Sequence, residues 1–230
     1  MNFRRRSWLL AATVVIAIGG SAALFLPTTQ HTQHTAPAAY QIDIARLPGL
    51  KDSLAATFAV EMQPTQTVTQ DNVDKFTAAL NALTVTPPEC LNAAAANFGQ
   101  TVGTVVTSLS AENKQFGVVI KAAESPRPFV TSAPVDACRT FDAERPDGAV
   151  SRTRVIDAPP VADAATSATH SIQTGGLAGD RVVDQYDYIA VLDDRHMVMV
   201  TSFANPTDTQ AVGEQVARLL ADAVNAVRWR

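Results

Sequence analysis

The chain has 230 residues, of which 47% are hydrophobic and 17% charged, and its formal net charge is −4. This length is sufficient for one domain with a sizeable core. The acidic balance argues against a nucleic-acid partner, because proteins bind nucleic acid mainly by placing Lys and Arg on its phosphates.

The first segment combines a basic cluster with an uncharged apolar run. Three arginines at residues 4–6 precede residues 8–26, which contain no charged side chain. As a helix this run would measure about 28 Å, close to the roughly 30 Å hydrocarbon core of a membrane. We expect the arginines to stay inside and the rest of the chain to be exported. Two alternatives stay open: an uncleaved signal anchor, or a signal peptide cleaved near the small residues 19–23.

The composition predicts three parts in the chain. Residues 1–26 form the signal anchor or signal peptide, residues 27–39 a flexible linker, and residues 40–230 one extracytoplasmic domain. The linker is rich in Thr and Pro and has no charged residue, so it cannot bury a core. We interpret its two histidines, His31 and His34, as polar spacer and not as metal ligands. The domain is expected to be anchored to the cell membrane, or secreted after cleavage.

Cys90 and Cys138 are the only cysteines in the chain. They are too far apart for a C-x-x-C redox pair, and they offer too few ligands at short spacing for a metal site. In an oxidising compartment we expect them to form a disulfide, which would join two short helices across a hairpin. The alternative is a pair of separate, buried, reduced thiols.

The first half of the predicted domain contains one clear helix. Val73, Phe76, Leu80 and Leu83 recur at helical spacing, and Thr69 precedes them as the expected N-cap. Strands are expected at residues 40–44, 58–62 (ended by Pro64), 102–109 and 116–123, and helical turns at residues 50–56 and 88–96.

The second half predicts more strands and a final helix. Residues 186–192 and 196–201 read as a hairpin with a charged turn. Thr207 and Gln210 match a capping box, and Arg228 and Arg230 are expected to close the helix that follows. Two further strands are expected at residues 150–156 and 167–174. Strands bracketed by helices predict an α+β domain with a mainly antiparallel sheet and helices packed on it.

The motifs of common catalytic sites are absent from the sequence. There is no Gly-x-Ser-x-Gly, as in serine hydrolases of the α/β type, and no His-Glu-x-x-His. Residues 175–179 are rich in glycine but lack the lysine of a phosphate-binding loop, so we interpret them as a plain loop. We therefore predict a protein that is not an enzyme, with no catalytic residues, no metal site and no cofactor.

Four polar residues are weaker candidates for a site. His170 and His196 are the only histidines in the predicted domain. His196 adjoins the charged turn at residues 193–195, and we interpret this group as a solvated turn. Asp184 and Asp187 flank a tyrosine, where a cation site is conceivable, but we interpret both as solvated strand residues.

Several short motifs occur in a familiar order. The sequence reads IDIAR at residues 42–46, FAVE at 58–61 and TPPEC at 86–90, followed by a distant second cysteine and a final hairpin and helix. This order resembles small exported mycobacterial domains classed as sensor-like or of unknown function. It also resembles the extracellular sensor domain of a mycobacterial receptor serine/threonine kinase. The resemblance implies a sheet-and-helix sandwich with a groove for an envelope ligand. This chain has no kinase domain, and it has one cysteine pair where the kinase sensor has two.

Two classes of function follow from these observations. The first is a non-catalytic ligand-binding or sensor-like domain of the cell envelope, for a lipid or small molecule. Its groove would be lined by Tyr188, Met197, Met199 and Phe203, which would otherwise be ordinary core residues. The second is a structural or interaction protein of the envelope that docks a protein partner through a surface patch. A large apolar pocket would favour the first class, and a flat exposed apolar patch the second.

Overall fold

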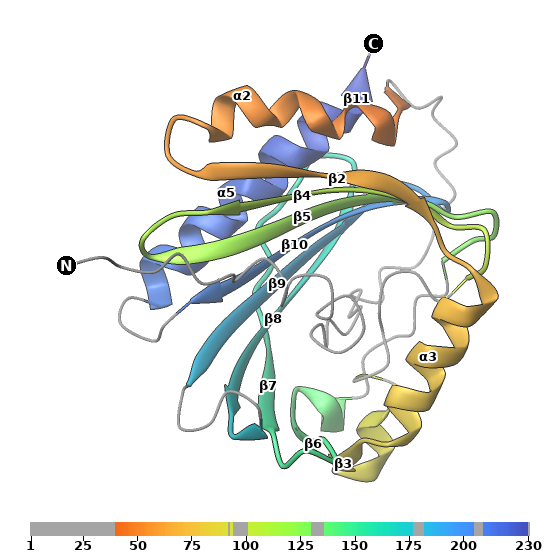
Figure 1. Ribbon diagram of the computed structural model, residues 1–230, viewed down its shortest axis with the longest axis vertical. Helices are drawn as coiled ribbons and strands as arrows, with labels where there is room; N and C mark the ends of the chain where they lie inside the picture. Colours follow the sequence, from red (N-terminus) through yellow and green to blue (C-terminus); the bar gives the residue numbers. More distant parts are fainter. Residues whose placement is uncertain are drawn as a thin grey trace, which may run out of the picture.

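A single curled antiparallel sheet dominates the fold (Figure 1). The computed structural model describes residues 40–91, 93, 101–129, 136–176, 182–204 and 209–229. The nine strands follow the order β2-β4-β5-β10-β9-β8-β7-β6-β3. Their bounds are β2 (Ala59–Thr67), β3 (Thr84–Thr86), β4 (Val105–Glu112), β5 (Phe116–Glu124), β6 (Thr140–Glu144), β7 (Val150–Ile156), β8 (Ala165–Thr174), β9 (Val183–Val191) and β10 (His196–Ala204).

Helices cover one face of this sheet, which we call the helix face. The elements are η2 (Ile44–Leu50), α2 (Lys51–Leu54) and α5 (Thr209–Val227). One register row of this face runs across five strands and is formed by Leu109, Ile120, Val200, Tyr188 and Ala168. These side chains are buried together with the apolar stripe of α5. The predicted α+β class, with a mainly antiparallel sheet, is confirmed.

Helix α3 (Gln70–Asn81) connects the two edge strands, because it follows β2 and precedes β3. Nine strands in a flat sheet would place those edges about 38 Å apart, whereas a helix of 12 residues is about 18 Å long. The sheet therefore has to curl, as Figure 1 shows. The N-cap prediction is confirmed: Thr69 accepts from the Asn72 backbone N–H, and the Asn72 side chain accepts from the Thr69 N–H.

The two ends of the described domain pair with each other. Strand β1 (Gln41–Ile42) runs antiparallel to β11 (Arg228–Trp229). The expectation that Arg228 closes the last helix is wrong, because α5 ends one residue earlier. The Arg228 guanidinium donates instead to the carbonyls of Ala162 and Asp163, at 2.6 and 2.8 Å. Thr207, half of the expected capping box, lies outside the described residues.

Two other strand predictions need correction. Strand β2 continues past Pro64 to Thr67, because it is an edge strand and its register shifts between Gln63 and Gln66. A proline at such a place removes no ladder hydrogen bond. Strands β3 and β6 were not predicted; they are short and pair with each other at the far edge.

The disulfide prediction is confirmed. Cys90 lies in the turn η3 (Pro88–Cys90) and Cys138 in η4 (Asp136–Cys138), with their Cα atoms 5.4 Å apart. The bond joins turns on either side of the β4–β5 hairpin, and it packs among the buried side chains of Val85, Phe141 and Ala143.

The membrane predictions concern residues that the structure does not describe. Residues 1–39 fall outside the described part, so the anchor and the linker stay predictions. Among the described residues, no helix has both the length and the apolar character needed to cross a membrane.

Candidate functional site

The face of the sheet opposite to the helices mixes polar and apolar side chains, and we call it the opposite face. One of its rows runs Ser108, Lys121, Met199, Ile189 and Ser167 across five strands. Such a row alternates with the apolar row of the helix face, because successive side chains of a strand point to opposite sides. The sheet therefore separates an apolar core from a surface with ionisable groups.

Asp187 is at the centre of a buried hydrogen-bond network on the opposite face. Thr201 Oγ1 donates to its Oδ1 at 2.6 Å, and Gln185 Nε2 donates to its Oδ2 at 2.7 Å. Gln173 Nε2 in turn donates to Gln185 Oε1 at 2.6 Å. We call Asp187, Thr201, Gln185 and Gln173 the Asp187 network. Its members come from β8, β9 and β10, so only the sheet register brings them together.

Burial shifts the charges of this network. It raises the pKa of Asp187 to about 6, although the hydrogen bonds from Thr201 and Gln185 and the charge of Lys121 act in the opposite direction. Burial also lowers the pKa of Lys121, and the Asp187 charge opposes that change. The two groups therefore stabilise each other's charged form across the sheet.

An apolar cluster adjoins the Asp187 network. Ala123, Ile189, Met197 and Met199 are buried in it. The side of the opposite face towards β4 and β5 is only half-buried, at Ser108, Ser110, Val119, Lys121 and Phe203. The opposite face thus offers polar, charged and apolar atoms at the edge of its buried region.

The expected groove lining is wrong. Met197 and Met199 belong to the apolar cluster of the opposite face, whereas Tyr188 packs in the core under the helix face. Phe203 is half-buried. Tyr188 and its neighbour Ile189 on β9 point to opposite faces of the sheet, and Ile189 shares its face with the two methionines. The four residues therefore cannot line one surface.

Asp184 and Asp187 are not solvated strand residues, contrary to expectation. Their exposed fractions are 1% and 0%. They lie three residues apart on β9 and so point to opposite faces of the sheet, which also excludes a cation shared between them. The presence of hydrophilic residues in an otherwise apolar strand does not show whether they are buried, because burial depends on the neighbouring strands.

Asp184 forms a hydrogen bond with His170 on the helix face. His170 Nε2 and Asp184 Oδ1 are 2.9 Å apart, and Arg154 Nε donates to His170 Nδ1 at 3.1 Å. The His170 ring stacks on Tyr186 with ring centroids 4.5 Å apart. The sequence pattern points to His170 and Asp184 separately and gives no sign of Arg154, because the three residues come from three different strands.

His196 lies in the turn that the sequence predicts. Asp193 Oδ1 accepts from the backbone N–H groups of Arg195 and His196, at 2.8 and 2.7 Å. The His196 ring is bonded to the same carboxylate, with Nδ1 2.8 Å from Oδ2. Asp193 thus organises the hairpin turn, and the interpretation of these residues as a turn is confirmed.

The glycine-rich loop is described only at its start. Gly175 and Gly176 have φ values of +76° and +66°, which other residues adopt with strain. A Cβ on Gly175 would lie 2.8 Å from the Gly148 carbonyl oxygen, so these glycines allow a close approach of two loops. Residues 177–179 lie outside the described part.

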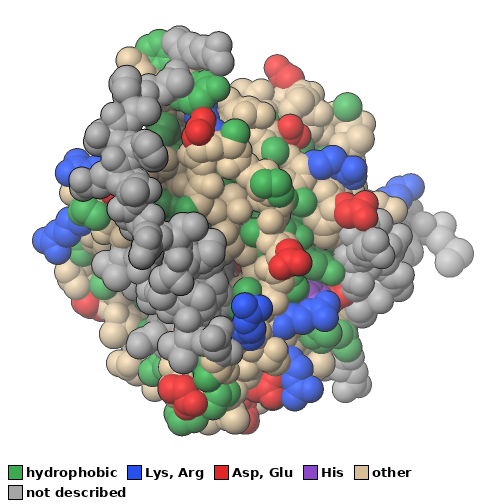
Figure 2. Space-filling model, turned by 180° about the vertical axis from the view of Figure 1, so that it is seen from behind, with side chains coloured by type: hydrophobic (Ala, Val, Ile, Leu, Met, Phe, Trp, Pro, Cys, Tyr) green, Lys and Arg blue, Asp and Glu red, His purple; other side chains and the backbone are tan. Residues whose placement is uncertain are grey.

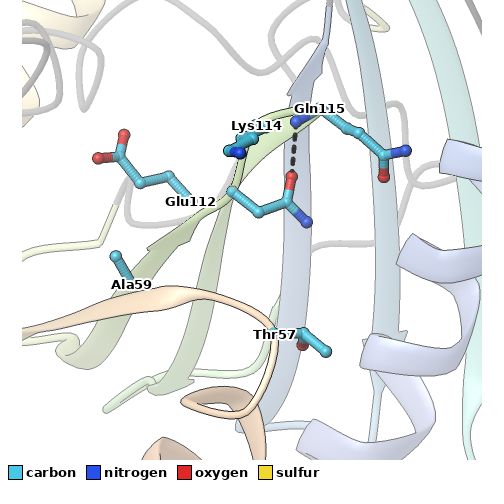
Figure 3. Close-up of a pocket in the computed structure, with 6 residues that line it drawn as sticks. Thr57, Ala59, Glu112, Lys114 and Gln115 are labelled. Carbon is cyan, nitrogen blue, oxygen red and sulfur yellow. Dashed lines mark hydrogen bonds between the residues drawn. The ribbon is translucent and has the colours of Figure 1, made fainter.

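A hollow of about 530 Å³ lies beside the β4–β5 turn (Figure 3). The only hydrogen bond drawn there runs from the Gln115 backbone N–H to Asn113 Oδ1, at 2.8 Å. The six residues that line it are Thr57, Ala59, Glu112, Asn113, Lys114 and Gln115, none of them buried. An open hollow without a buried polar group is a weaker candidate than the opposite face.

The charged surface has no dominant sign. Figure 2 shows acidic and basic side chains interspersed on the face that it presents. Within the described ranges, no three His, Cys, Asp or Glu side chains lie close enough together to hold a metal ion.

The comparisons with known proteins give a family without an assigned function. A family model described as "Domain of unknown function (DUF5642)" matches residues 43–228, so the chain belongs to this family. A crystal structure of an uncharacterized protein from Mycobacterium smegmatis, described as an Rv0999 ortholog, is similar with a TM-score of 0.62 and 25% identity. That similarity covers 81% of this chain and 97% of the other. No curated protein matches the chain. The mycobacterial likeness is thus supported, while the likeness to a kinase sensor domain stays a prediction.

Proposed function

We propose that this member of the DUF5642 family is a non-catalytic ligand-binding or sensor-like domain of the cell envelope, and that its ligand contacts the opposite face of the sheet. The observation that carries the proposal is the buried Asp187, whose charge interacts with that of Lys121 two strands away. An ionisable pair in the centre of a sheet contributes little to stability, because the cost of desolvating the two charges offsets most of their attraction. Groups with displaced pKa values cluster at functional sites more often than elsewhere.

The surroundings of the pair favour a ligand with both a polar and an apolar part. Lys121 and Ser108 are half-buried in one register row, so a polar group can reach them from solvent. Met199 follows Lys121 in the same row and belongs to the apolar cluster. Binding sites combine apolar walls with a few placed polar groups. A lipid or another small amphiphile of the envelope fits this arrangement.

The predicted export signal supports a place outside the cytoplasmic membrane. Residues 4–6 are basic and residues 8–26 uncharged and apolar, and the Cys90–Cys138 disulfide is typical of an oxidising compartment. A reporter that is active only in the cytoplasm, fused after Arg230, is expected to give no signal. A strong signal would overturn this part of the proposal. The N-terminal residue of the mature protein distinguishes the anchored form from the secreted form.

The test of the ligand site compares two lysines. The full chain is purified from its own envelope, and native mass spectrometry measures the mass of any retained small molecule. We expect Lys121→Met to lose the retained mass. Lys114→Met should keep it, because Lys114 is exposed in the β4–β5 turn. Equal retention in wild type and Lys121→Met, or no retained molecule in wild type, would contradict the proposal.

The second candidate function is docking of a protein partner, and one observation favours it. Val150 and Ile172 are 36% and 41% exposed, on β7 and β8. Both lie on the part of the helix face near the β3 edge. Ile172 pairs with Arg152, and Val150 lies two residues before Arg152, so the three side chains point to the same side of the sheet. Retention of a protein in place of a small molecule, lost in Ile172→Asp, would favour this function.

A further inference from the structure

A polar relay on the helix face connects a buried carboxylate to an exposed guanidinium. Arg154 Nε donates to His170 Nδ1 at 3.1 Å, and His170 Nε2 lies 2.9 Å from Asp184 Oδ1. The side chains of His170 and Asp184 are 5% and 1% exposed, whereas Arg154 is exposed. We call these three residues the Arg154 relay. It shares no residue with the Asp187 network and lies on the other face of the sheet.

The hydrogen bonds determine which ring nitrogen of His170 carries its proton. A guanidinium can only donate, so Nδ1 must accept from Arg154, and Nε2 carries the hydrogen that it donates to Asp184. In a hydrolytic dyad the acceptor nitrogen faces a nucleophile. Here it faces Arg154, so the relay does not prepare a nucleophilic attack. It holds a cationic side chain in place.

The relay has a cost that packing does not explain. Asp184 Oδ2 is buried and has no hydrogen-bond partner among the described residues, and a buried polar atom without a partner typically lowers stability. What the relay provides is a fixed arginine. The Nε–H group of Arg154 donates inward to His170, whereas its terminal Nη1 and Nη2 groups make no hydrogen bond or ion pair with the described residues. A fixed guanidinium with two free parallel donors matches the oxygens of a phosphate, sulfate or carboxylate.

We propose that Arg154 is the centre of an oxyanion-binding site on the helix face, in which His170 and Asp184 are positioning residues. The oxyanion accepts two hydrogen bonds, from Nη1 and Nη2. Ile172, which is 41% exposed, lies on the same face on the neighbouring strand and offers contact to an apolar part of the bound molecule. The oxyanion belongs either to a free solute or to a lipid headgroup.

The neighbouring Arg152 is a matched control. It lies two residues from Arg154 on the same strand and face, but its guanidinium is already bonded to Asp142. Arg152 Nε donates to Oδ1 at 2.8 Å and Nη2 to Oδ2 at 2.9 Å. Within the part of the chain that the structure describes, the same residue type is thus present once with a carboxylate partner and once without.

The first experiment titrates the full chain, labelled with ¹⁵N-arginine, with sodium sulfate and with sodium acetate at constant ionic strength. We expect the Arg154 Nε–Hε signal to shift and the Arg152 signal to stay. Arg154→Lys keeps the charge but removes the parallel donors, and it should weaken binding by about tenfold or more. Arg152→Lys should weaken it less than about twofold. Equal loss in both variants would show a nonspecific charge effect and overturn the proposal.

The second experiment separates the two sources of the oxyanion. Vesicles of phosphatidylglycerol and of phosphatidylcholine are mixed with the full chain, and co-sedimentation is measured for wild type and Arg154→Lys. Binding of sulfate or acetate in solution supports a free solute. Binding to phosphatidylglycerol alone, lost in Arg154→Lys, supports a headgroup. Absence of binding that depends on Arg154 in every arm overturns the proposal, whatever the result at Lys121.

The third experiment tests the positioning role of His170. His170→Phe keeps a ring to stack on Tyr186 but removes the acceptor for Arg154. We expect the Arg154 Nε–Hε exchange with water to rise to the rate of the exposed Arg218, and anion affinity to fall about tenfold. If this variant does not fold, the Nε–Hε exchange rates of the wild-type protein test the positioning role. Equal Nε–Hε exchange rates for Arg154 and Arg218 in the folded protein would overturn the positioning role.

Discussion

Asp184 and Asp187 lie three residues apart on one strand, and both are buried, but the two faces of the sheet give them different partners. Asp184 has the His170 imidazole at one oxygen and, among the described residues, no partner at the other. Asp187 has a hydroxyl and an amide, with the charge of Lys121 nearby. The comparison teaches that burial alone does not define a carboxylate's role. Asp184 holds a neighbour that fixes an exposed arginine, whereas Asp187 is itself the displaced titratable group.

The largest expected effect on stability comes from the disulfide, which lies outside the surroundings of both Asp184 and Asp187 and so serves as a control. Cys90→Ala or Cys138→Ala should lower the free energy of unfolding by about 4 kcal/mol, because the bond closes a loop of 48 residues. The double variant should cost little more than either single one. Urea unfolding measures both values. The NMR signals of Arg154 should not change, and a change there would show that the disulfide also determines the geometry of the relay.

Removing His170 tests the burial of Asp184. In His170→Ala neither oxygen of the buried Asp184 carboxyl group has a partner among the described residues, so the free energy of unfolding should fall by about 3 kcal/mol or more. The additional Asp184→Ala change should restore part of this loss, because it removes the unpartnered carboxyl group. A double variant that is less stable than His170→Ala would mean that Asp184 contributes more than its bond to His170.

The pH dependence of stability tests Asp187. Its pKa in the folded protein, about 6, lies above the ordinary value of 3.8, so between these values the folded protein holds a proton that the unfolded chain releases. The free energy of unfolding should therefore fall as pH rises from about 4 to about 6, by up to about 3 kcal/mol. Asp187→Asn should remove this slope. Chemical unfolding at several pH values measures it, and an unchanged slope would assign it to another group.

Thr201→Val removes one of the two side-chain donors to the Asp187 carboxylate. The shape is nearly kept, but the hydrogen bond of 2.6 Å is lost. We expect a loss of about 2 kcal/mol at neutral pH and a further rise of the Asp187 pKa, because the bond favours the charged form. A ¹³C carboxyl titration by NMR reports the pKa. A lowered pKa in this variant would contradict the assigned role of Thr201.

The smallest expected effect concerns the exposed pair beside the relay. The hydrogen bond from Arg152 lowers the pKa of Asp142, but the arginine side chain is 70% exposed. Asp142→Asn should therefore change the free energy of unfolding by less than about 1 kcal/mol. It would also free Arg152, but no histidine among the described residues holds that guanidinium in place, so we expect oxyanion binding to stay selective for Arg154 in the NMR titration. Equal binding at Arg152 in this variant would show that a free guanidinium is sufficient and would contradict the positioning role of the relay.

The local patterns of the sequence were sufficient for several elements. Helix α3 with its cap at Thr69, the hairpin of β9 and β10, and the pairing of Cys90 with Cys138 follow from spacing, turn residues and cysteine count. Each of these depends on residues close together in the chain or, for the disulfide, on there being one partner. The edge strand β3 and its neighbour β6 were not predicted, because three to five residues are too few to show a period.

Only the tertiary structure decided what the polar residues of the sheet do. Arg154, His170 and Asp184 become neighbours through the register of β7, β8 and β9, as do Thr201 and Asp187 through that of β9 and β10. A shift of one residue in either pairing would turn these side chains to the wrong face. The alternation along each strand tells which residues share a face, but the burial of that face depends on the elements that cover it, and these come from distant parts of the chain.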